Sequence, residues 1–88
     1  MSTSSSPGPA NTYSVVSTID VREVPHQGRH QLIYKTFENL QPGQAFILVV
    51  DHDPKPVLFE LDFMHKGTFA YAYLEQGPLF RIQMAKIK

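Results

Sequence analysis

The chain has 88 residues, no cysteine, and eight basic and eight acidic side chains that cancel at pH 7. The lack of cysteine excludes disulfides and thiolate chemistry, and the balanced charge lacks the basic excess that binding to nucleic acid or to an anionic membrane usually requires. The longest apolar run, residues 45–50, is far shorter than the roughly 20 residues that cross a bilayer, so we expect a cytoplasmic protein that binds neither nucleic acid nor membrane.

The first half of the chain is predicted to form a strand, a helix and a second strand after a short tail. Residues 1–14 are rich in Ser, Pro and Gly and are predicted to be a disordered tail before a single domain over residues 15–88. The β-branched residues 15–21 predict a strand, and apolar residues at helical spacing predict a helix over 29–39. Residues 44–51 are apolar on both faces, which is typical of a central strand.

The second half is predicted to form a helix and a hairpin. Pro56 suits the first turn of a helix, which the apolar stripe extends to residue 65, and Asp53 is placed to cap that helix. Residues 68–74 and 79–88 both alternate apolar and polar side chains around a Gly77-Pro78 turn, so they predict two antiparallel strands.

The order βαβαββ predicts an α/β (α+β) two-layer sandwich. Two right-handed crossovers make the first two strands parallel and put both helices on one face of a mixed four-stranded sheet. The aromatic stripe of Phe69, Tyr71 and Tyr73 either packs beneath the helices, which we favour, or lies on the open face. If these rings and those of Phe59 and Phe63 are exposed, we expect the chain to self-associate as a homodimer.

A set of polar residues follows the first two strands and is our candidate site. The carboxyl ends of parallel strands meet at one edge of a sheet, where open α/β sheets bind ligands. We therefore expect a surface that binds a small ligand or a protein partner at this edge. It comprises His26, Arg29, His30, Asp51, His52, Asp53 and Lys55.

Other interpretations of these residues stay open. His26, His30 and His52 with the two aspartates are of the right chemical type to bind zinc, iron or copper. The structural alternative is that Asp53 only caps the helix, that the other aspartate only ends the strand, and that Arg29 and Lys55 are solvated. A phosphate site is disfavoured because there is no glycine-rich loop and because two carboxylates at the start of a helix repel an anion.

Several segments together resemble a known family. They are residues 19–25, 29–30, 37–40, 42–43, 73–78 and, most specifically, Asp-His-Asp-Pro-Lys-Pro at 51–56. The chain resembles the bacterial family called domain of unknown function 2249, although it lacks the tryptophan that members commonly have in the last strand. That family is similar to the TusA-like sulfur carriers, so the resemblance implies their βαβαββ fold. The carriers' Cys-Pro-x-Pro motif is missing here, and persulfide relay needs cysteine.

The function expected from these observations is that of a small non-enzymatic binding or interaction module. No glycine-flanked serine sits on a strand-to-helix turn, which argues against a hydrolase. Relatives in the resembled family often occur with haemerythrin-like or cupin domains and near denitrification genes, which implies a redox or metal-handling context. The alternative is therefore a metal- or haem-associated protein that uses the histidines and aspartates of the two loops.

Overall fold

The computed structural model describes residues 13–88. It contains four strands and two helices in the expected order. The elements are β1 (Ser14–Asp20), α1 (His26–Glu38), β2 (Gln44–Val50), α2 (Lys55–Met64), β3 (Phe69–Gln76) and β4 (Phe80–Lys86). The βαβαββ order is confirmed. The predicted tail lies outside the described residues except for Tyr13 and Ser14, and Ser14 already belongs to β1.

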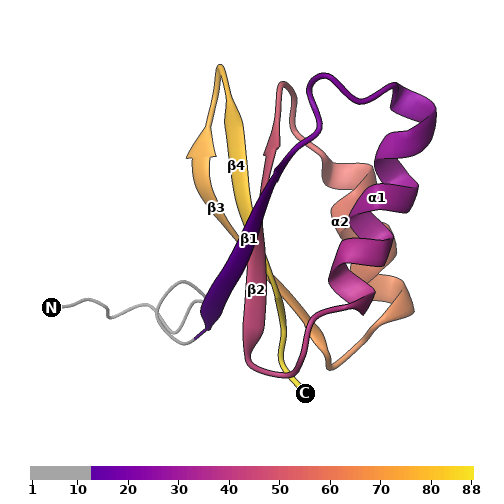
Figure 1. The fold of residues 1–88 in the computed structure, drawn as a ribbon, viewed down its shortest axis with the longest axis vertical. Helices are drawn as coiled ribbons and strands as arrows, with labels where there is room; N and C mark the ends of the chain where they lie inside the picture. The colour runs from indigo at the N-terminus through magenta and orange to yellow at the C-terminus, as the bar shows by residue number, and fades with distance from the viewer. Residues whose placement is uncertain (1–12) are drawn as a thin grey trace, which may run out of the picture.

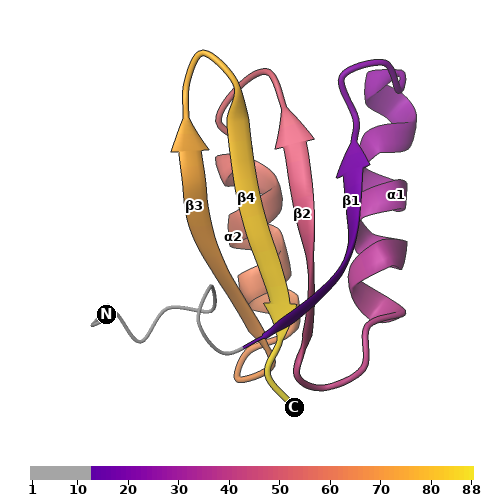
Figure 2. The same ribbon diagram turned by 60° about the vertical axis from the view of Figure 1, so that its left-hand side comes forward.

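The four strands form one mixed sheet in the order β1-β2-β4-β3 (Figure 2). β1 runs parallel to β2, with Ile19 opposite Leu48, and β4 runs antiparallel to both of its neighbours, with Ile82 opposite Leu48. β2 therefore has partners on both sides, and residues 45–50 are all buried. The central position predicted from its two apolar faces is confirmed.

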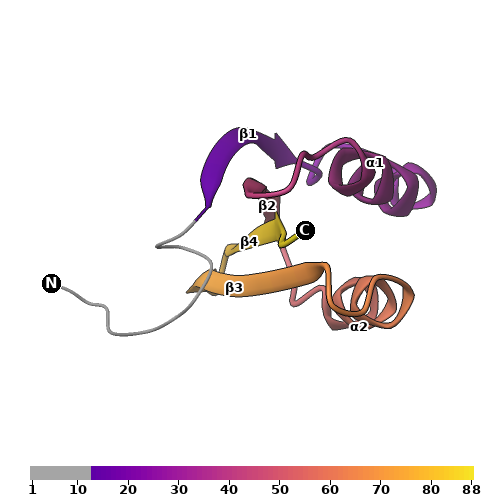
Figure 3. The ribbon, with the colours of Figure 1, turned by 90° about the horizontal axis from the view of Figure 1, so that it is seen from below.

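Both helices cover the same face of the sheet, which gives two layers (Figures 1 and 3). The core lies between these layers, because inward side chains of the central strands meet the apolar stripes of the helices. Its most completely buried side chains are Val21, Phe37, Phe46, Leu48, Leu58, Leu61, Ile82 and Met84.

The aromatic stripe of β3 faces the helices. Phe69 is buried, and Tyr71 and Tyr73 are half-buried and pack against the core. The favoured interpretation of this stripe is confirmed. Phe59 and Phe63 lie off the apolar stripe of α2 and are exposed, with 62% and 74% of their surface accessible.

Helix α1 begins three residues earlier than predicted. Pro25 has φ −55° and stands at the N-cap, and the Gly28 N–H reaches its carbonyl oxygen at 2.9 Å. The glycine that suggested a turn is thus part of the first helical turn, where it costs little. As a result His26 and His30 lie on one helix, one turn apart.

The predicted cap of α2 is wrong. The N-cap residue is Pro54, and among the described residues no side chain caps the helix. The Asp53 carboxylate instead accepts a hydrogen bond from the Tyr73 hydroxyl of β3 at 2.5 Å. Over residues 13–88, neither helix has the length and apolar character needed to cross a membrane.

Candidate functional site

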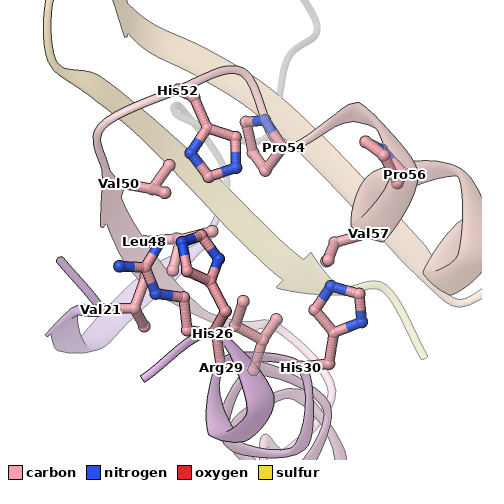
Figure 4. Close-up of a pocket in the computed structure, with 11 residues that line it drawn as sticks. Val21, His26, Arg29, His30, Leu48, Val50, His52, Pro54, Pro56 and Val57 are labelled. Carbon is pink, nitrogen blue, oxygen red and sulfur yellow. The ribbon is translucent and has the colours of Figure 1, made fainter. Parts of the chain in front are cut away.

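A cavity of about 80 Å³ lies where the carboxyl ends of β1 and β2 meet the first turns of α1 and α2. Figure 4 shows its lining, in which polar atoms come from His26, Arg29, His30 and His52. Aliphatic and proline side chains form the remaining walls. They are Val21, Ile33, Leu48, Val50, Pro54, Pro56 and Val57. The predicted meeting of the two loops at one edge follows from the parallel pairing of their strands.

Arg29 is buried, with 7% of its surface exposed, so its predicted solvated position is wrong. Its Nε donates to the carbonyl oxygen of Val24 at 2.8 Å and its Nη2 donates to that of Arg22 at 3.0 Å. These bonds tie the loop after β1 to the first turns of α1. The third nitrogen, Nη1, is buried and has no hydrogen-bond partner among the described residues; the Asp51 Oδ1 atom lies 3.8 Å away.

Asp51, which was predicted to end the strand, follows the last residue of β2 and orients His52. Its Oδ1 lies 2.9 Å from the Nδ1 atom of the His52 ring. A proton on Nδ1 makes this contact a hydrogen bond and leaves Nε2 with its lone pair. The bond from His52, assisted by the charge of Arg29, lowers the pKa of the exposed Asp51 carboxyl.

The three histidines surround the mouth of the cavity. The rings of His26 and His52 are 6.2 Å apart between centroids, and the His30 ring lies 6.0 Å from that of Tyr34. All three histidines are exposed. Within residues 13–88, no three side chains of His, Asp, Glu or Cys are grouped closely enough to hold a metal ion. The three predicted histidine ligands therefore share a cavity without forming a ready coordination shell.

Three of the seven predicted residues do not line the cavity. Asp51 stands beside it, Lys55 is exposed at the first position of α2, and Asp53 is turned toward β3. Burial, together with the hydrogen bond to Asp53, raises the pKa of Tyr73 to about 12. The site thus consists of His26, Arg29, His30 and His52, with the three remaining residues around it.

Sequence reasoning missed the apolar walls and the role of Tyr73. Val21 directly follows β1, Val50 is the last residue of β2, and both line the cavity. The alternation of side chains along each strand, combined with the parallel pairing, could have predicted these two positions. The contact between Tyr73 and Asp53 joins residues that are 20 positions apart. No local pattern signals such a pair, since it depends on how β3 lies beside the loop before α2.

The family model described as "Uncharacterized conserved protein (DUF2249)" matches residues 18–86. The chain belongs to this family. The resemblance noted from the sequence is thereby confirmed, and the DUF2249 match runs from within β1 to the end of β4, so it includes all residues that line the cavity. A search of curated proteins and a search of solved structures each found no match.

Proposed function

We propose that this member of the DUF2249 family is a non-enzymatic binding module whose ligand enters the cavity between α1 and α2. One observation carries the proposal: four polar side chains, three from the start of α1 and one from the loop before α2, converge on a hollow with otherwise apolar walls. Binding sites typically combine an apolar lining with a few placed polar groups in this way. The exposed histidines leave the mouth accessible to a ligand.

The size of the cavity restricts the ligand. At about 80 Å³ it is well below the roughly 300–1,000 Å³ of pockets for drug-sized molecules, yet a water needs only about 10–15 Å³. The cavity therefore suits a ligand of a few heavy atoms, or the tip of one side chain from a protein partner. A porphyrin needs a far larger opening, which disfavours the haem version of the alternative.

The lining favours binding over catalysis. It contains no Ser, Thr or Lys that a histidine would activate as a nucleophile. The two nearby carboxylates are engaged elsewhere, Asp51 with His52 and Asp53 with Tyr73. Histidines without a nucleophile or a free carboxylate are better suited to hold a ligand than to transform it.

A chemical-shift titration tests the proposal. Protein labelled with ¹⁵N is titrated with a panel of small neutral, anionic and metal-ion ligands, and saturable shifts are expected at His26, His30 and His52. His52→Ala should weaken the binding, whereas His65→Gln, which changes a histidine outside the cavity, should not. Absence of any saturable ligand, or shifts confined to other surfaces, contradicts the proposal.

A second candidate function is metal binding, and the contact of Asp51 with His52 favours it. Metal-ligating histidines almost always donate their other ring N–H to an acceptor such as a carboxylate. Rotations of both His26 and His30 toward His52 Nε2 would complete a three-nitrogen set from α1 and the loop before α2. This version places the protein in a metal-handling context.

Metal analysis of protein purified without a histidine tag distinguishes the two functions. A stoichiometric metal that is lost in His52→Ala supports the second candidate. Tag-free protein that is empty, and that shows no saturable shift with Zn²⁺ or Cu²⁺, contradicts it.

A further inference from the structure

We infer that the ligand of this cavity is a small oxyanion, an inference that rests on the proposed ligand-binding function. Every polar side chain in the lining is an arginine or a histidine, and none is a carboxylate. These side chains donate hydrogen bonds; arginine carries a positive charge, and histidine gains one when it is protonated. A carboxylate, phosphate or sulfate group complements the buried guanidinium and the N–H donors of this set.

Arg29 is the strongest element of the inference. It lines the cavity, is more than nine-tenths buried, and its Nη1 has no hydrogen-bond partner within residues 13–88. A buried charge with an unmet donor is costly, so an anion beside it would be stabilising. Nη1 is shielded in this structure, so direct contact requires a small shift of a neighbouring side chain. The charge of Arg29 acts on a ligand in the cavity even without contact, because Arg29 lines the cavity and is buried from water.

The helix ends add positive potential at the same place. Both α1, with 13 residues, and α2, with 10, begin at this end of the sheet (Figure 1). In the part of the chain that the structure describes, neither first turn holds an acidic residue or a side-chain cap. Their free N–H groups and helix dipoles therefore favour an anion.

Neither of the carboxylates that argued against an anion lines the cavity. Asp53 accepts the hydrogen bond from Tyr73 and is drawn toward β3. Asp51 lies beside the cavity with its Oδ1 3.8 Å from Arg29 Nη1, but 57% of its side chain is exposed, so water screens its charge. The repulsion predicted from the sequence is thus largely removed by the tertiary structure.

The geometry also limits the kind of oxyanion. Two of the three nitrogens of Arg29 donate to backbone carbonyl oxygens. Arg29 therefore cannot form the bidentate pair of hydrogen bonds that arginine often makes with a phosphate or a carboxylate. One donor nitrogen and the histidine N–H groups suit a compact anion. Acetate represents the planar class, and inorganic phosphate and sulfate represent the tetrahedral class.

The test compares acetate with acetamide, its neutral counterpart, in ¹⁵N chemical-shift titrations at constant ionic strength set with sodium chloride. Phosphate and sulfate are titrated in the same way. At least one oxyanion should give saturable shifts at the first-turn amides of α1 and α2 and at the three histidines, and acetamide should bind at least about tenfold more weakly than acetate. Acetamide binding as tightly as acetate, or binding of Zn²⁺ alone, overturns the inference and leaves the binding function standing. If no ligand binds at all, both fall.

Variants locate the anion. Arg29→Met should weaken binding by at least about tenfold, because charge-assisted hydrogen bonds are the strong ones. Asp51→Asn keeps an acceptor for His52 but removes a competing negative charge, so it should strengthen binding several-fold. Lys66→Met, which removes a positive charge at the far end of α2, should change nothing. If Arg29→Met does not fold, Asp51→Asn decides: unchanged or weakened binding there contradicts the inference.

Discussion

The hydroxyl of Tyr73 on β3 donates a 2.5 Å hydrogen bond to Oδ1 of Asp53, which immediately precedes the N-cap of α2. The bond links an edge strand of the sheet to the loop that carries His52. It therefore helps to fix the position of the loop between β2 and α2.

Tyr73→Phe should destabilise the protein. The substitution leaves the half-buried Asp53 carboxylate without its donor, which costs on the order of 1–3 kcal/mol of the free energy of unfolding. Urea unfolding measures the change. The double variant Tyr73→Phe with Asp53→Ala should recover part of the loss, because no unpaired carboxylate remains. A single variant as stable as the wild type would show that the bond does not form in solution.

Two of the four tyrosines should ionise late in an alkaline titration. Burial and a hydrogen bond to a carboxylate raise the pKa of both Tyr34, which bonds Glu60, and Tyr73 to about 12. Because each folded value lies above the unfolded one of about 10, the stability they contribute is fully present below that pH and is lost as pH rises through about 12. Tyrosinate absorbance follows the ionisation, and Tyr73→Phe should remove one of the two late groups but not the other.

The Asp51 carboxyl should titrate below the ordinary range of an aspartate. The hydrogen bond from His52 is the main cause, so His52→Ala should raise the Asp51 pKa toward its ordinary value. Since the folded pKa is lowered, the stability from this contact is present above the unfolded value of about 3.9 and is lost as pH falls through the folded one. Carboxyl ¹³C shifts measure the Asp51 titration in the wild type and in the variant. An unchanged Asp51 titration in the variant would contradict the contact.

Arg29→Met should cost about 2–3 kcal/mol of the free energy of unfolding. Its guanidinium holds two carbonyl oxygens of the loop between β1 and α1, and hydrogen bonds to charged groups are among the stronger ones. Arg22→Gln is the matched control, because that side chain is exposed and only pairs with Asp20 on the surface. Denaturant midpoints compare the two. Equal losses of stability in both variants would argue that the hydrogen bonds of Arg29 do not stabilise the loop between β1 and α1.

Phe63→Ser should leave the monomer nearly as stable as the wild type, whereas Phe37→Ala should lose about 3–5 kcal/mol. Phe37 is fully buried between α1 and the sheet, but three quarters of Phe63 is exposed. Of the rings whose joint exposure would predict a homodimer, only Phe59 and Phe63 are exposed, and sedimentation of Phe63→Ser tests whether they suffice. A wild-type dimer that becomes monomeric in Phe63→Ser supports self-association through α2, and a wild-type monomer contradicts it.

The sequence by itself determined the order of the elements and the place of the site. The run of residues 45–50 has two apolar faces, which is typical of a central strand, and β2 is indeed paired on both sides and buried along this run. Parallel pairing with β1 then follows from the crossover rule, and it brings His26 and His52 to one edge. These inferences need only local periodicity and chain connectivity, which the sequence carries.

The tertiary structure alone decided what each polar group does there. Asp53 has the sequence context of a helix cap. A capping hydrogen bond competes, however, with hydrogen bonds to other donors that packing brings near the carboxylate, and the Tyr73 hydroxyl is such a donor. Arg29 was expected in water, yet two backbone carbonyls hold it against the cavity. The Asp-His-Asp segment thus loses one carboxylate to β3 and one to His52 and solvent. That loss is what leaves a cavity of donors, because contacts between residues distant in the chain set the direction of each side chain.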